Sequence, residues 1–219
     1  MFFLNNRTYH FKIYKCCVIF RIKKMKETIK NSLEKAISYP EYRTLVKDLL
    51  DKGKSTGPNQ SDDLLNYSLL NDKRMKRLDK TIKLTEETIA KLKDLKEPQT
   101  WLVLTEGWCG DAAQNLPVIH KIAEQNPNIN LKLVLRDENL ELMDEFLTNG
   151  GRSIPKLIAL DKENEVISTW GPRPTTATKM VVDYKNEHGS LDGEFKKDLQ
   201  VWYNKDKGND VQKDIISFI

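Results

Sequence analysis

The chain has 219 residues, of which 39% are hydrophobic and 31% are charged, and its formal net charge is +4. This length allows one ordinary domain with sizeable additions or two small domains, and the charged fraction indicates a soluble surface. The 36 basic and 32 acidic residues nearly balance, which argues against nucleic-acid binding. Three cysteines are too few for a disulfide framework, so we expect a cytoplasmic protein.

Residues 1–24 show no sustained helical pattern. Their one dense apolar stretch begins at Cys16 and is shorter than a signal-peptide core or a membrane span. We therefore expect an unstructured leader, or upstream sequence in a chain whose translation starts at Met25. A strand over Tyr9–Phe20 is the alternative, and in that case Cys16 or Cys17 becomes a candidate resolving thiol.

Residues 25–97 carry the spacing of helices. Apolar side chains recur every three or four positions from Ile29 onward, and Tyr39-Pro40 ends the first segment. A second, short helix is expected from Glu41. Lys52–Gln60 is rich in loop-forming residues, and a further helical stretch continues from Leu64 until Pro98. Such an apolar stripe is typical of packing surfaces, so we expect a helical extension packed on the rest of the chain.

The pattern changes at about residue 98, where apolar strands alternate with amphipathic helices. We expect strands at 101–105, 129–135, 156–160 and 165–170, and helices at about 110–123, 138–147 and 175–184. This order predicts an α/β fold in which helices flank a central mixed sheet. We divide the chain into a leader (1–24), a helical extension (25–97), an α/β domain (98–188) and a tail with one helix (189–219).

Two short segments carry the candidate site. Cys109 lies in the Trp-Cys-Gly-Asp-Ala sequence of residues 108–112, Pro117 follows in the expected helix, and Arg-Ser-Ile-Pro occupies residues 152–155. These segments resemble the active turn, the helix proline and the cis-proline loop of thioredoxins. The resemblance covers about Gln99 to His188. The chain is also similar to bacterial thioredoxin family proteins that have an N-terminal helical extension with a Tyr-Pro-x-Tyr-Arg segment, here Tyr39 to Arg43, and a Trp-Cys-Gly-Asp active turn.

The resemblance implies a thioredoxin-like fold and assigns roles to individual residues. Cys109 is then the catalytic residue. The residues that support the active turn are Trp108, Gly110, Asp111, Ala112 and Pro117. The residues of the substrate groove are Ser153, Ile154 and Pro155, with a cis bond before Pro155.

Two departures from thioredoxins alter the expected chemistry. Ala112 replaces the resolving cysteine, so this turn cannot form an intramolecular disulfide. Val103 stands where thioredoxins keep a buried aspartate. We therefore expect a monothiol protein that forms mixed disulfides with protein thiols or a low-molecular-weight thiol, without a cofactor, metal, nucleic acid or membrane. The alternative is a redox-silent interaction module.

The electrostatic environment of Cys109 has two opposing contributions. A helix N-terminus lowers the pKa of a cysteine, whereas a neighbouring carboxylate such as Asp111 raises it. The sequence does not decide between them. Glu106 and Asp111 either influence which partner binds or are solvated loop acids.

Overall fold

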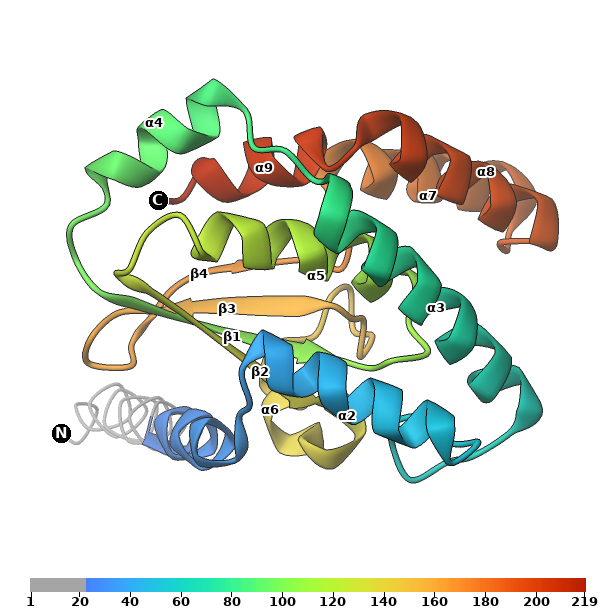
Figure 1. Ribbon diagram of the computed structural model, residues 1–219, viewed down its shortest axis with the longest axis horizontal. Coiled ribbons are helices and arrows are strands. Elements are labelled where there is room, and N and C mark those ends of the chain that lie inside the picture. Colours follow the sequence, from blue (N-terminus) through green and yellow to red (C-terminus); the bar gives the residue numbers. More distant parts are fainter. Residues whose placement is uncertain (1–22) are drawn as a thin grey trace, which may run out of the picture.

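The computed structural model describes residues 23–219, with a four-stranded mixed sheet at its centre (Figure 1). The strands are β1 (Gln99–Thr105), β2 (Ile129–Leu135), β3 (Lys156–Leu160) and β4 (Val166–Trp170), in the spatial order β2-β1-β3-β4. Helices lie above and below this sheet in the view of Figure 1. The expected α/β fold, with helices flanking a mixed sheet, is therefore confirmed.

The strand directions bring several loops to one end of the sheet. β1 pairs parallel with β2 and antiparallel with β3, and β3 pairs antiparallel with β4. The ends of β1, β2 and β4 therefore lie at the same end of the sheet as the start of β3. This places the segments after Thr105, Leu135 and Trp170 near the segment before Lys156.

Burial explains why the central strands are almost continuously apolar. β1 and β3 lie inside the sheet, and Trp101, Leu102, Leu157 and Ile158 are all fully buried. Strands that are covered on both faces lose the alternation of apolar and polar residues. β4 forms an edge of the sheet, and its residues alternate between partly buried and exposed, with Ile167 exposed.

Side-chain caps determine where the N-terminal helices begin. These helices are residues 23–35, α2 (Tyr39–Asp51), α3 (Asp62–Thr81) and α4 (Glu86–Asp94). Ser38 and Glu41 form a capping box on α2, and the Ser61 side chain accepts a hydrogen bond at the start of α3. The helical stretch expected up to Pro98 is broken, because Thr85 accepts a hydrogen bond from the Thr88 N–H and starts α4.

The N-terminal helices share one hydrophobic core with the sheet. Ile29, Tyr42, Met75 and Leu92 belong to the same buried cluster as the residues of β1 and β3. Ile37 also exchanges backbone hydrogen bonds of 2.8 and 2.9 Å with Leu133, so the linker before α2 pairs with the outer edge of β2. The expectation that the extension packs on the α/β region is met by these contacts.

The helices after β1 differ from expectation in two places. α5 (Gly110–Ala123) and α7 (Thr175–His188) match the expected positions, whereas α6 (Leu140–Glu145) is shortened by a 3-10 turn at Arg136–Glu138. The tail contains the expected helix, α8 (Gly193–Asp206), and a second helix, α9 (Asn209–Ile216), that the sequence pattern did not predict. Left-handed Lys207 and Gly208 separate them, and a Cβ at Gly208 would lie only 2.6 Å from a Val118 methyl group.

α7 and α8 pack on each other around a small core of their own. This second cluster consists of Ala177, Val181, Phe195, Leu199 and Tyr203. No helix among residues 23–219 is long and apolar enough to cross a membrane. The expectations for residues 1–22, including Cys16, Cys17 and the alternative strand, lie outside the described residues.

Candidate active site around Cys109

Cys109 lies where the turn after β1 becomes α5, and it caps that helix. Its Sγ accepts a hydrogen bond from the Ala112 N–H at 3.5 Å and donates one to the Ile154 carbonyl oxygen at 3.3 Å. The following Ile154–Pro155 peptide bond is cis. The structure therefore brings together the two segments that the sequence singled out, and only 9% of Cys109 is exposed.

Burial dominates the protonation of this thiol. It raises the pKa of Cys109 to about 12, with a further increase from the Asp111 carboxylate. The backbone N–H groups of Ala112 and Asp111 and the charge of Arg173 lower that pKa, but by less. The helix N-terminus favours a thiolate, but desolvation of the buried sulfur has the larger effect, so the pKa of Cys109 is raised. A protonated thiol also fits the hydrogen bond that Cys109 donates to Ile154.

Asp111 is held in an ion pair and is not a solvated loop acid. An Arg173 Nη2 lies 2.6 Å from one carboxylate oxygen, and the Tyr203 hydroxyl donates to the other at 3.0 Å. Only 11% of the Asp111 side chain is exposed. Burial raises the pKa of Asp111, while Arg173 and Tyr203 oppose this shift. Asp111 therefore connects the active turn to the loop after β4 and to α8.

Glu106 is the second acid beside the thiol, and it is fully buried. The Thr56 hydroxyl donates a short hydrogen bond to its carboxylate, and the backbone N–H of Asp137 donates another at 2.9 Å. Burial raises the pKa of Glu106 above its ordinary value, while these two hydrogen bonds oppose the shift. Glu106 thereby joins the end of β1 to the loop before α3 and to the turn after β2.

The remaining predicted residues surround these contacts. Trp108 is half-buried, and the Arg136 guanidinium lies 4.8 Å from the centre of its ring. Ala112 is buried in the first turn of α5, and Pro117 lies farther along the same helix. Ser153 is half-buried in the loop before Pro155, where its N–H donates to the Gly151 carbonyl oxygen.

Residues from helices and loops that are distant from Cys109 in the sequence complete the site. Asn71 on α3 donates to the Gly107 carbonyl oxygen at 3.0 Å, and the Gly107 N–H donates to Thr56 at 2.8 Å. The sequence offered no signal for Asn71 or Thr56, because both act through contacts between distant segments. The position of Arg173 near Cys109 could be weakly inferred from the sequence, because Arg173 follows β4 at the end of the sheet where Cys109 lies.

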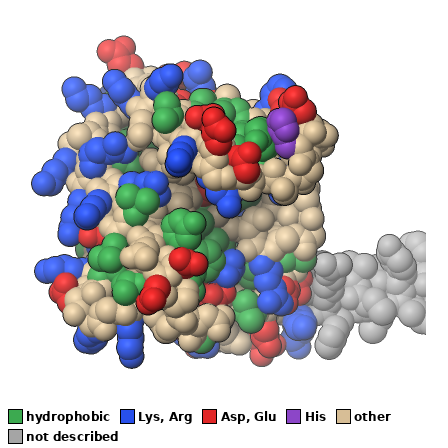
Figure 2. Space-filling model, turned by 90° about the vertical axis from the view of Figure 1, so that its right-hand side faces the viewer, with side chains coloured by type: hydrophobic (Ala, Val, Ile, Leu, Met, Phe, Trp, Pro, Cys, Tyr) green, Lys and Arg blue, Asp and Glu red, His purple; other side chains and the backbone are tan. Residues whose placement is uncertain are grey.

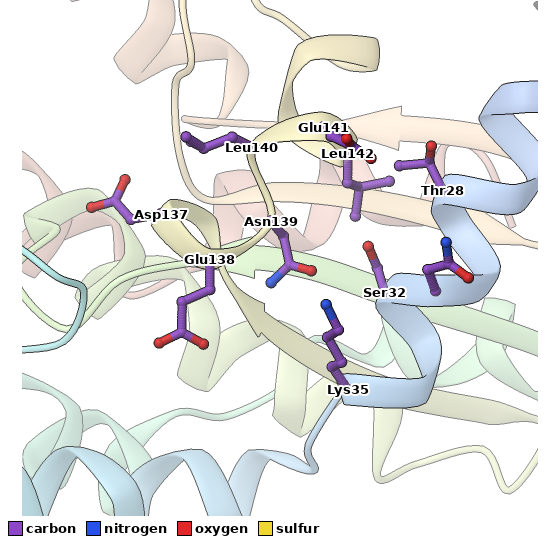
Figure 3. Close-up of a pocket in the computed structure, with 10 residues that line it drawn as sticks. Thr28, Ser32, Lys35, Asp137, Glu138, Asn139, Leu140, Glu141 and Leu142 are labelled. Atoms are coloured by element: carbon purple, nitrogen blue, oxygen red, sulfur yellow. The ribbon is translucent and has the colours of Figure 1, made fainter.

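A separate polar pocket of about 430 Å³ lies beside the helix at residues 23–35 (Figure 3). Its lining residues are Thr28, Asn31, Ser32, Lys35, Asp137, Glu138, Asn139, Leu140, Glu141 and Leu142. Cys109 is not among them, so the cavity is not a substrate pocket for this thiol. Within residues 23–219, no three histidine, cysteine or acidic side chains are grouped in a way that would hold a metal ion.

A comparison with models of known protein families agrees with the fold and with the placement of Cys109 beside Pro155. The family model described as thioredoxin matches residues 57–187, which is more than half of the chain. The chain belongs to this thioredoxin family. The matched region begins before α3, so it is wider than the resemblance seen from Gln99 to His188 and includes α3 and α4.

Two solved structures share the fold. A crystal structure of a protein of unknown function from Pseudomonas aeruginosa has a TM-score of 0.52 and 17% identity, covering 83% of this chain and 96% of its own. The crystal structure of an HIV epitope scaffold has a TM-score of 0.52 and 18% identity, covering 83% and 97%. At these identities, the likeness supports the fold alone. Among curated proteins, none matches this chain.

Proposed function

We propose that this thioredoxin family protein takes part in thiol redox chemistry through Cys109 alone. One observation carries the proposal: the Cys109 Sγ caps α5 and lies 3.3 Å from the carbonyl oxygen of Ile154, directly before Pro155. A sulfur at a helix N-terminus is positioned for stabilisation as an anion. The Trp-Cys-Gly-Asp-Ala turn has Ala112 where a second thiol would act, so the proposed chemistry is monothiol exchange.

The proposed step is attack of the Cys109 thiolate on a disulfide. A bond forms between Sγ and one substrate sulfur, the substrate disulfide breaks, and the second sulfur leaves with the electron pair as a thiolate. The proton of Cys109 passes to solvent or to the leaving thiolate. Because Ala112 cannot resolve the mixed disulfide, a thiol of another molecule must do so. Protein thiols or disulfides, or a low-molecular-weight thiol, in the cytoplasm are the partners in this proposal.

The buried thiol makes exchange slow in the resting structure. A pKa of about 12 leaves only a minute fraction of Cys109 ionised at neutral pH. Relative to an ordinary cysteine with a pKa of about 8.5, the thiolate fraction is lower by roughly three thousandfold. The proposal therefore includes a movement of the folded protein that uncovers Cys109 before exchange.

Mass spectrometry after treatment with oxidised glutathione tests the proposal. We expect an adduct on the Cys109 peptide of the folded protein and none at that position in a Cys109→Ser variant. Peptide mapping separates Cys109 from Cys16 and Cys17, and unfolded protein shows that the reagent is active. If the unfolded chain is modified at Cys109 and the folded chain is not, the redox proposal is wrong.

A redox-silent interaction module is the second candidate, and the burial of Cys109 favours it. The side of the molecule in Figure 2 has groups of hydrophobic side chains near its centre and lysine and arginine side chains along its left edge, a surface suited to a protein partner. Cys109→Ser keeps the shape and removes the nucleophile. A cellular phenotype that survives this substitution favours the module, whereas its loss favours redox chemistry.

A further inference from the structure

The three residues after β4 are each held by a different part of the active site. A Cβ on Gly171 would lie 2.1 Å from the Pro155 carbonyl oxygen, so this backbone packs directly on the cis-proline loop. The next carbonyl, that of Pro172, accepts a hydrogen bond of 3.2 Å from the Asn115 side chain of α5. Arg173 then pairs with Asp111 at 2.6 Å. Contacts on three successive residues fix the position of the Arg173 guanidinium beside the active turn.

One donor of this guanidinium is left without a partner. The Nε of Arg173 is buried and has no hydrogen-bond acceptor among the described residues. An unpaired buried donor on a charged group is costly, and native structures rarely keep one without a role. The contact with Asp111 is made through Nη2 and does not satisfy Nε.

Arg173 and Asp111 act on the thiol in opposite directions. The positive charge of Arg173 favours the anionic sulfur of Cys109, and the negative charge of Asp111 disfavours it. Asp111 nevertheless holds Arg173 in place through the 2.6 Å contact. The same carboxylate therefore both positions the favourable charge and suppresses ionisation of the resting thiol.

We propose that Arg173 is a positioning residue for thiol exchange at Cys109, held beside the active turn by Gly171, Pro172 and Asp111 so that its charge stabilises the anionic sulfur. This inference rests on the proposed redox function and adds the residue that supports the attacking thiolate. Arginine suits the role because it stays charged at every relevant pH and keeps a rigid donor geometry.

Other polar groups near the thiol do not supply this positive charge. Tyr42 on α2 and Tyr203 on α8 are buried phenols whose pKa values are raised by burial, so both are neutral. Glu106 in the active turn is an acid, and burial raises its pKa. Arg74 on α3 lies near Gly110, but its Nη1 donates to the Asn71 side chain at 2.8 Å. Arg136, after β2, lies over the Trp108 ring and donates to Asp137 at 2.9 Å. Of these cations, Arg173 is the one paired with an acid of the active turn, through its 2.6 Å contact with Asp111.

The rate of alkylation of Cys109 by iodoacetamide, measured from pH 7 to pH 10, tests the inference. Arg173→Gln should lower the rate at each pH by a few-fold, because its charge affects the thiol less than burial or Asp111 does. Asp111→Asn should raise the rate by a larger factor, because it removes the stronger charge while the asparagine oxygen can still accept a hydrogen bond from Arg173. Arg173→Lys should recover part of the loss, since it keeps the charge.

The matched control is Arg77→Gln. Arg77 on α3 contacts α8 through Asn204 at 2.6 Å, so this substitution removes the same charge and also a contact with α8. We expect no change in the alkylation rate of Cys109 in this variant. Peptide mapping again separates Cys109 from Cys16 and Cys17.

The direction of the changes separates this inference from a purely structural role. If Arg173 and Asp111 only keep the site closed, both substitutions expose the thiol and both raise its alkylation rate, which overturns the inference. Equal rates in all variants overturn it as well. If the rates shift in opposite directions but oxidised glutathione gives no Cys109 adduct, the redox function fails while the role of Arg173 stands.

Discussion

Glu106 and Asp111 lie on either side of Cys109, and they stabilise the site in different ways. Glu106 is fully buried and receives hydrogen bonds from neutral groups, the Thr56 hydroxyl and the Asp137 N–H. Asp111 is paired with a cation, Arg173. The Glu106 side connects the turn to segments that come before β1 and after β2, whereas the Asp111 side connects it to segments after β4.

This difference shows how two buried acids coexist within one short turn. A buried carboxylate needs either a counter-charge or several hydrogen-bond donors. Asp111 uses the first solution and Glu106 the second. Because each acid recruits partners from a different part of the chain, the active turn depends on both the N-terminal helices and the C-terminal helices.

The largest effect should come from Gly171→Ala on the Asp111 side. Gly171 has a φ of +113°, and a Cβ there would lie 2.1 Å from the Pro155 carbonyl oxygen. We expect a loss of more than about 3 kcal/mol in the free energy of unfolding, measured by urea denaturation. Gly193→Ala is the control, since a Cβ at Gly193 meets no atom within 4 Å. Equal stability of the two variants would contradict the structure.

Asp111→Ala should have the next largest effect. It leaves the Arg173 guanidinium and the Tyr203 hydroxyl without their shared acceptor. We expect the free energy of unfolding to fall by about 2–3 kcal/mol. This is at or below the lower limit for breaking a buried ion pair, because Arg173 is partly exposed. Asp144→Ala removes a carboxylate from an exposed pair with Arg152 and should change stability little. A similar loss in both variants would mean that the Asp111 pair is no stronger than a surface contact.

Thr56→Val tests the Glu106 side. The substitution keeps the shape of the side chain but removes the hydroxyl that donates to Glu106 and accepts from the Gly107 N–H. We expect the free energy of unfolding, measured by urea denaturation, to fall by about 2 kcal/mol, because the substitution leaves a buried carboxyl group without one of its donors. Thr56→Ser keeps the hydroxyl and should retain most of the stability. If the serine variant loses as much as the valine variant, the methyl group matters and the hydrogen bond does not.

The smallest effect should be a change in pH dependence caused by Glu106→Gln. Burial raises the pKa of Glu106 in the folded state, so the folded protein retains this proton to a higher pH than the unfolded chain. The contribution of Glu106 to stability is therefore full at low pH and is lost as pH rises through the raised pKa. Urea denaturation between pH 4 and pH 8 should show that the fall in stability with pH is shallower in Glu106→Gln. A parallel profile in both proteins would show that Glu106 keeps an ordinary pKa.

Local pattern was enough to predict much of the fold. The continuous apolar run at Trp101–Leu104 predicts a central strand, and that strand is buried on both faces. The pairing of Cys109 with Pro155 was predicted from the motif, and the two segments do meet. These features depend on residues that lie close together in the sequence or on a strong family resemblance.

The partners of the two acids could not be predicted in the same way. Asp111 and Tyr203 are separated by 92 positions, and Thr56 and Glu106 by 50. Nothing in the local pattern around an acid indicates which distant side chain will cover it, because burial is decided by how helices pack. The break between α8 and α9 did leave a local signal, since Gly208 stands between them.

The distance between Asp111 and Tyr203 also matters while the chain is being made. A ribosome adds roughly 5–20 residues per second. Tyr203 is 92 positions after Asp111, so about 5 to 18 s separate the synthesis of these two residues at that rate. Throughout this interval the Asp111 carboxylate lacks the Tyr203 hydroxyl as a donor. Thr56, in contrast, precedes Glu106 in the chain, so the donor on the Glu106 side is already present when Glu106 is added.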